Sequence, residues 1–208
     1  MAQPEPALIL KTAPTGESFV TLSALSAERG LFYCLQRYSK SAQKNGTRAD
    51  LFDTAELQLQ AARNGNGTLF INDYRLQQKR EKIGHSYPCL LHASNYAALL
   101  VRNATHMPDT AALFDLAERT LDAFDSEKAP QIVFLKGLYL LLLTEGFPVR
   151  EDWLPRLDPK QFPIAQELIQ KPSPPKPTTN QIEACDHITE HLCNWLRRET
   201  DIVLPWKA

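Results

Sequence analysis

The sequence predicts an α+β protein in which a small barrel of five strands is followed by an all-α helical part. Two observations predict this order. Short apolar runs separated by turns continue to about Leu76, whereas from Pro88 onward the apolar residues recur with helical spacing. Five short strands in so little chain suit a barrel, because closure removes exposed strand edges. We therefore expect two domains, residues 1–80 and 81–208.

The strands are separated by turns that glycine makes possible. The chain reverses around Gly16 and again at Gly30, and the segment Asn64-Gly65-Asn66-Gly67 is a strong hairpin signal because these residues tolerate positive φ. The fourth run alternates roughly as a strand. The expected strands are residues 8–10, 19–25, 31–35, 51–59 and 68–76.

Helices are expected at residues 88–106, 108–124, 130–146 and 180–199. The third of them is apolar nearly all round, interrupted by Lys136, and should be the buried centre of the second domain. Asn180, with Glu183 three residues later, resembles a capping box that opens the last helix. The proline-rich residues 171–180 are expected to be a stiff spacer.

Composition excludes several classes of protein. The formal net charge of the 208 residues is −1, but residues 1–82 carry +3 and the rest −4. The beginning of the chain has no secretory signal, and the longest apolar block, residues 132–143, is too short for a membrane span, so we expect a cytosolic protein. The four cysteines form no CxxC pair and are expected to be reduced and buried. No catalytic triad or phosphate-binding loop is visible, so neither an enzyme nor a cofactor is predicted.

A cation-rich loop follows the third expected strand. Each lysine or arginine that neutralises a phosphate releases condensed counterions, so these side chains are candidates for DNA contact. An ordinary solvated loop is the competing interpretation. The loop candidates are Arg37, Lys40, Lys44 and Arg48. A second basic group lies at the domain junction, where a solvated linker explains it equally well; its members are Arg75, Lys79, Arg80 and Lys82.

Aromatic side chains near the loop offer stacking platforms for bases. Tyr38, beside the loop cations, is expected to be exposed and to contact DNA. Phe32 and Tyr33 are consecutive in a strand and face opposite ways, so at least one belongs to the core. For Phe32, Tyr33 and Phe70, core packing is the expected role.

The last helix carries residue types that bind metals, namely Cys185, His187, His191 and Cys193. The two histidines share one helical face, but Cys185 lies about 200° round the helix from His187. One helix cannot close a tetrahedral site from these four residues, so we expect inward thiols, outward histidines and no metal. The carboxylates of Asp122, Asp125 and Glu127 are expected to be solvated surface rather than an acid/base pair.

Several short motifs occur in a fixed order along the chain. In the first half they are LILKT, Thr15-Gly16-Glu17-Ser18, FVTLSAL, Glu28-Arg29-Gly30, LFYCLQRYSK, Leu51-Phe52, Ala55-Glu56-Leu57 and Gly67-Thr68-Leu69. In the helical half they are Tyr96-Ala97-Ala98-Leu99, PDTAALFDLAERTLDAF and FLKGLYLLLLTEGFPV. This order resembles the bacterial recombination mediator RecO family over about residues 8–150.

The resemblance implies an OB-fold barrel and a role in DNA repair and recombination after DNA damage, in the RecF pathway. It implies binding of single- and double-stranded DNA, strand annealing, and partnership with RecR and single-stranded-DNA-binding protein (SSB) to help load RecA, in a nucleoid-associated location. An apolar groove with a cation such as Arg102 or Lys136 would receive the acidic tail of SSB.

The chain departs from the family in two places. Residues 151–163 contain no cysteine where many members carry a four-cysteine-type zinc module, so no zinc is predicted. Tyr38 stands where the family's basic loop often has glycine. Two other functions remain open: a protein-interaction scaffold whose barrel does not bind DNA, and a metal-dependent hydrolase built on the C-terminal His/Cys group.

Overall fold

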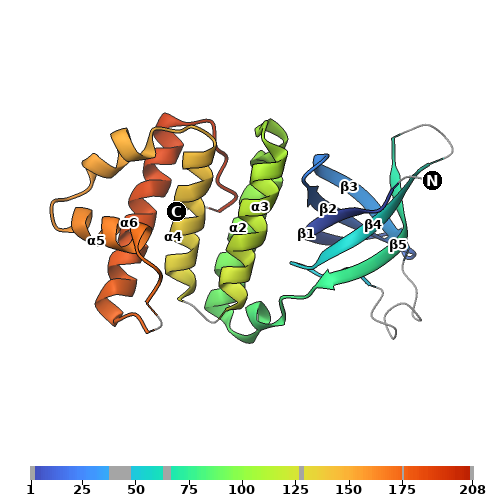
Figure 1. Ribbon diagram of the computed structural model, residues 1–208, viewed down its shortest axis with the longest axis horizontal. Coiled ribbons are helices and arrows are strands. Elements are labelled where there is room, and N and C mark those ends of the chain that lie inside the picture. Colours follow the sequence, from blue (N-terminus) through green and yellow to red (C-terminus); the bar gives the residue numbers. More distant parts are fainter. Residues whose placement is uncertain (1–2, 38–47, 63–66, 127–128, 175, 207–208) are drawn as a thin grey trace. The chain divides into compact units, whose positions relative to one another are not determined.

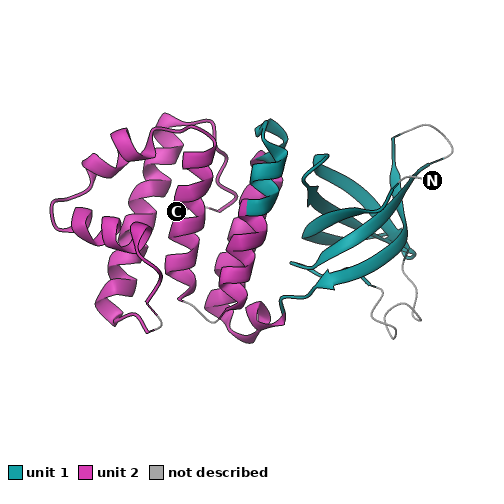
Figure 2. Cartoon of the chain, viewed as in Figure 1, with its two compact units in different colours: residues 1–80, 104–115 teal, residues 81–103, 116–208 magenta. Residues whose placement is uncertain are grey.

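The computed structural model describes residues 3–37, 48–62, 67–126, 129–174 and 176–206. The chain divides into two compact units (Figure 2): residues 1–80 with 104–115, and residues 81–103 with 116–208. The second unit thus begins at Glu81, where the sequence placed a domain boundary. Residues 104–115 group with the barrel instead, which the sequence did not indicate.

The first unit contains a closed barrel of five strands (Figure 1). The strands are β1 (Glu5–Thr15), β2 (Phe19–Ser26), β3 (Gly30–Arg37), β4 (Thr54–Ala61) and β5 (Leu69–Gln78). Their order round the barrel is β1-β2-β3-β5-β4, and every pairing is antiparallel except the short parallel one between β3 and β5. This is an OB-like barrel. The predicted α+β class, a five-stranded barrel followed by helices, is confirmed.

The barrel is filled by alternate residues of its strands, as a period of two requires. In β3, Phe32 and Cys34 belong to the buried core, while Tyr33 and Arg37 are exposed. Burial raises the pKa of the Cys34 thiol to about 12, with a smaller contribution from the Glu5 carboxylate. The prediction that one of Phe32 and Tyr33 belongs to the core is confirmed, and that one is Phe32.

The fourth strand begins three residues later than expected. Residues 50–53 form a turn in which the Asp50 N–H donates to Asp53 Oδ2 at 3.0 Å and Phe52 has φ +69°. Tyr74 Oη also donates to Asp53 Oδ2, at 2.7 Å. Asp53 is buried, and burial raises the pKa of its carboxyl above the usual value although the Tyr74 bond opposes the shift. The strand predicted from Leu51 is therefore wrong at its start, because aspartate side chains offer the backbone a competing turn.

The turn between β2 and β3 is held by a buried carboxylate. Glu5 accepts from Ser26 Oγ at 2.9 Å and from Arg29 Nε at 2.6 Å. Gly30 follows with φ +68°, a conformation that favours glycine. Thr110 Oγ1 donates to the Ala27 carbonyl at 2.6 Å, which fastens the segment 104–115 to this turn.

The second unit is helical. The helices of the chain are α2 (Tyr87–Asn103), α3 (Thr110–Asp125), α4 (Pro130–Thr144), α5 (Gln161–Gln170) and α6 (Thr179–Glu199). Short turns of 3₁₀ or π-helix are η1 (Glu81–His85), η2 (Ala104–His106), η3 (Val149–Trp153) and η4 (Leu154–Arg156). Of these elements, the first unit contains η2 and the start of α3. Of the helices in the described ranges, none combines the length and the apolar character that crossing a bilayer requires.

Helix α4 is the centre of this unit, as its all-round apolar sequence predicted. Most of its side chains are buried, and α2, α5 and α6 pack against it. It ends in a Schellman motif, in which Gly146 adopts φ +79°. The Gly146 N–H donates to the Leu143 carbonyl, and the Phe147 N–H donates to the Leu142 carbonyl. The predicted stop at Gly146 is confirmed.

The beginning of α6 differs from the prediction. The N-cap is Thr178, whose hydroxyl accepts from the Gln181 N–H at 3.3 Å while the Gln181 side chain accepts from the Thr178 N–H at 2.9 Å. Asn180 already lies inside the helix, so the predicted Asn180–Glu183 capping box is wrong. A threonine two residues earlier satisfies the same rule with glutamine in the third helical position.

Candidate nucleic-acid interface and partner groove

The outer surface of β2 and β3 carries the first group of candidate DNA contacts. Because Phe32 and Cys34 point into the barrel, Tyr33, Leu35 and Arg37 point outward. Tyr33 is 56% exposed, so the expectation that it packs in the core is wrong. Strands 2 and 3 are the face on which OB folds bind oligonucleotides. The cation and the aromatic ring therefore lie on the surface that this fold uses for ligands.

The basic loop leaves and rejoins the barrel beside this surface. The buried Gln36 side chain accepts a hydrogen bond from the Ala49 N–H at 3.0 Å. Gln36 and Ala49 are the sequence neighbours of Arg37 and Arg48, so this bond ties the two ends of the loop to each other. Arg37 and Arg48 are both exposed. The remaining loop candidates, Tyr38, Lys40 and Lys44, lie outside the described residues.

An aromatic pair adjoins Arg37. Phe19 lies directly across from Arg37 in the β2–β3 ladder, and the Phe19 and Phe70 rings meet edge to face with centroids 5.8 Å apart. Both rings are half-buried, and Phe70 lies opposite Leu35 in the β3–β5 pairing. The core role expected of Phe70 is therefore only partial. Phe19 was not predicted as part of this surface. Because Val20 faces the barrel core, strand alternation places its neighbour Phe19 on the outside.

The second basic group is not gathered with the first. Arg75 lies on β5 opposite Glu56 and is paired with Asp73 at 2.8 Å. Five residues of strand separate Arg75 from Phe70, which corresponds to about 16 Å. Lys79 is exposed near the end of the barrel segment, where its charge acts on the Asp53 carboxyl. Arg75 is therefore not part of the surface around Arg37, and Lys82 belongs to the second unit.

Arg80 has a structural environment. It is only 3% exposed, and its Nη1 donates to the Phe52 carbonyl at 2.8 Å and to Thr54 Oγ1 at 2.9 Å. The guanidinium thus supplies a hydrogen bond to the backbone carbonyl of Phe52, the residue with positive φ in the turn before β4. We therefore leave Arg80 out of the interface. The burial of Arg80 could not be predicted from the sequence because the residues just before it are polar or exposed.

We expect Arg80→Ala to destabilise the barrel rather than to act on ligand binding. The substitution removes two hydrogen bonds to a charged donor and leaves a buried carbonyl unpaired, so the free energy of unfolding should fall by about 2 kcal/mol. Chemical denaturation measures the change, with the exposed Arg75→Ala as the matched variant. Equal stability of the two variants would contradict this role of Arg80.

A groove of about 280 Å³ lies in the helical unit between α3, α4 and the segment after α5. Its walls combine apolar side chains with two cations. They are Leu116, Arg119, Thr120, Ala123, Val133, Lys136, Gly137, Leu140, Pro172 and Ser173. Leu140 is 42% exposed, so the groove presents apolar surface to solvent.

One of the two predicted partner residues borders this groove. Lys136 is half-buried in α4, and its Nζ donates to the Lys171 carbonyl. Arg102 is exposed in the last turn of α2 and does not line the groove. Arg119, on α3, is a second cation of the groove and was not predicted. It could have been found from the helical spacing of Leu116, Arg119 and Ala123.

The C-terminal His/Cys group does not assemble a metal site. Cys185 and Cys193 are buried, as expected, while His187 is exposed. His191 is half-buried and accepts a hydrogen bond from Trp153 Nε1 at 3.0 Å. Over the described ranges, no three His, Cys, Asp or Glu side chains come together in a way that would hold a metal ion.

Comparison with known proteins identifies no family. No family model matches the chain, and no curated protein matches it in sequence. The fold and the site therefore define a class only by architecture: an OB-like barrel with a cationic, aromatic outer surface, joined to a helical unit with a groove.

Proposed function

We propose that this protein is a DNA repair and recombination mediator of the RecO type. The barrel binds single- and double-stranded DNA and anneals complementary strands, and the protein acts with RecR to help load RecA on SSB-coated DNA. It does this in the cytoplasm, associated with the nucleoid, and without catalysing a chemical step.

The observation that carries the proposal is the outer surface of β2 and β3. Arg37 and Arg48 flank the loop that bears Lys40 and Lys44, and the Gln36–Ala49 bond supports the two stems. Tyr33 adds an exposed ring to the same strand as Arg37. Phosphate contacts of this kind carry no base information, which suits a protein that must let strands slide into register.

The groove on α3 and α4 supports the second part of the proposal. SSB tails combine acidic side chains with a terminal apolar pair. Apolar walls at Leu116, Val133 and Leu140 match the apolar pair, and Arg119 and Lys136 match the carboxylates. Recognition of acidic motifs by clustered cationic side chains is a recurring mode of peptide binding.

A scaffold without DNA binding is the competing function, and one observation favours it. Arg29 and Arg75 are each paired with a carboxylate, at 2.6 and 2.8 Å, so part of the barrel's positive charge is compensated. If the barrel binds DNA, the affinity for DNA must therefore come from the surface around Arg37.

An annealing assay separates the two functions. Two complementary oligonucleotides carrying a fluorescence donor and acceptor are mixed at low salt with and without the protein. We expect the protein to accelerate pairing, and a variant with Arg37→Ala and Lys40→Ala to lose most of the acceleration. A wild-type protein that leaves the pairing rate unchanged would support the scaffold.

A further inference from the structure

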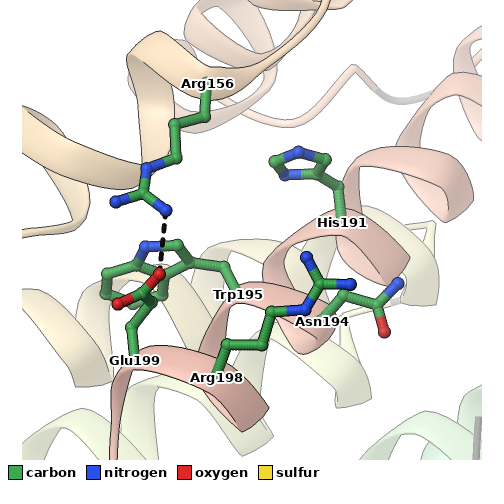
Figure 3. Close-up of a pocket in the computed structure, with 6 residues that line it drawn as sticks. All are labelled: Arg156, His191, Asn194, Trp195, Arg198 and Glu199. Atoms are coloured by element: carbon green, nitrogen blue, oxygen red, sulfur yellow. Dashed lines mark hydrogen bonds and ion pairs between the residues drawn. The ribbon is translucent and has the colours of Figure 1, made fainter.

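A pocket of about 190 Å³ lies between η4 and α6 (Figure 3). It shares no lining residue with the groove of α3 and α4. Residues of α6 spaced three or four apart supply most of the pocket, so they share one helical face. Its lining residues are Arg156, His191, Asn194, Trp195, Arg198 and Glu199. Neither the proposed DNA surface nor the groove uses any of them.

One wall of the pocket is fixed by a network of charged side chains. Arg156 Nη2 and Nε donate to Asp152 Oδ1 at 2.6 and 3.1 Å, and its Nη1 donates to Glu199 at 2.9 Å. Trp195 Nε1 donates to the other Asp152 oxygen at 2.8 Å. The Arg156 guanidinium is thus held in place, and two carboxylates balance its charge.

His191 presents a hydrogen-bond donor in the same region. Its Nδ1 accepts from Trp153 Nε1 at 3.0 Å, so in the neutral ring the proton is on Nε2. Burial, followed by the charges of Arg198 and Arg156, holds the pKa of His191 below its usual value. The imidazole therefore lies in positive potential.

Arg198 supplies an uncompensated charge. Its guanidinium extends toward the space bordered by His191 and Asn194 (Figure 3). Within the part of the chain that the structure describes, no hydrogen bond or ion pair engages this side chain. Arg197, the next residue, is turned to the Asn194 amide oxygen at 3.0 Å. An anion entering the pocket would therefore meet a guanidinium with all its donors available.

We propose that this pocket binds a phosphate group, as the free ion or as a phosphate monoester. The space is bordered by the Arg198 guanidinium, which has no hydrogen bond or ion pair among the described residues, and by the His191 imidazole. Arg156 adds positive potential at another wall, while its bonded N–H groups are directed to Asp152 and Glu199. Guanidinium groups are the preferred partners of phosphate because their N–H groups match its oxygens in pairs.

The test follows the imidazole signals of His191 by NMR, on the full chain at constant pH and ionic strength, with the His191→Gln variant to assign them. Inorganic phosphate and a nucleoside monophosphate are titrated separately, against chloride. We expect a saturable shift of the His191 signals with at least one phosphate compound, and tighter binding of the monophosphate if the natural ligand is an ester.

Two substitutions that should change the phosphate affinity in opposite directions locate the binding in this pocket. Arg198→Gln removes a charge-assisted contact and should weaken binding about tenfold or more. Glu199→Gln removes the pocket's exposed negative charge, while Asp152 still holds Arg156, and should tighten binding. Arg150→Gln, an exposed arginine of η3 outside the lining, is the control and should bind as the wild type does.

The proposal is overturned if phosphate moves the His191 signals no more than chloride does. It is equally overturned if Arg198→Gln and Arg150→Gln bind phosphate with the same affinity. Circular dichroism of each variant establishes that a lost response is not lost folding.

Discussion

Gly30→Ala is expected to lower the free energy of unfolding by about 3 kcal/mol. Gly30 has φ +68°, which L side chains adopt at a cost, and a Cβ at this position would lie 2.8 Å from Thr110 Cγ2. The strain of the backbone and the steric overlap should therefore add. Thermal or chemical unfolding of the variant measures the sum.

Two matched variants separate the two contributions. Gly16→Ala has a similar φ of +62° with no atom within 4 Å of the new Cβ, so it should show the backbone strain alone, about 1–2 kcal/mol. Thr110→Ser removes the clashing methyl but keeps the hydroxyl that bonds to the Ala27 carbonyl. In the Gly30→Ala background it should restore part of the stability. If it restores none, the close approach of residue 110 to this turn is wrong.

Lys136→Glu is expected to weaken binding of an acidic tail peptide to the groove by a factor of about ten or more. The peptide carries aspartates followed by an apolar pair and a free terminal carboxylate. Reversing the charge of Lys136 replaces an attraction with a repulsion at the groove wall, while Arg119 remains. Fluorescence anisotropy of the labelled peptide gives the affinity.

Two further variants locate the binding. Leu140→Gln alters the apolar wall at a side chain that is 42% exposed, so it should reduce affinity with little effect on folding. Lys160→Glu makes the same charge reversal at an exposed residue before α5 and should have almost no effect. Equal weakening by Lys136→Glu and Lys160→Glu would mean that the peptide senses only the net charge.

Local patterns predicted much of the fold. The apolar sequence of α4 encodes its burial directly, because an all-round apolar helix must be enclosed. The uniformly apolar run of residues 31–35 predicted a strand but not which of its side chains face inward, so Tyr33 was wrongly expected in the core.

The turn at residues 50–53 was not predicted because two bonds to the Asp53 carboxylate support it, one from the nearby Asp50 N–H and one from Tyr74, 21 residues later. Helix α5 was not predicted from the sequence, because Pro159 just before it and Pro163 within it obscure the helical spacing of its apolar residues.

The candidate site shows the same division. Arg37 could be found from the sequence because it is a cation that directly follows an apolar strand. The position of Phe19 beside Arg37 follows only from the β2–β3 register. The sequence suggested that Arg80 is a surface cation, whereas the structure shows it bonded to the Phe52 carbonyl. Long-range partners decide whether a charged residue faces solvent or supports the backbone, and the local sequence does not carry that information.

The salt dependence of single-stranded DNA binding tests most directly whether the barrel presents cations to the phosphate backbone. The logarithm of the affinity should fall linearly with the logarithm of salt concentration, by about 0.7 for each phosphate neutralised. The variant with Arg37→Ala and Lys40→Ala should lower the magnitude of that slope by about 1.4. The control variant with Lys160→Ala and Lys176→Ala, two exposed lysines of the helical unit, should keep it. A slope that is the same in all three proteins, or an absence of binding at low salt, would contradict the proposed role of the barrel.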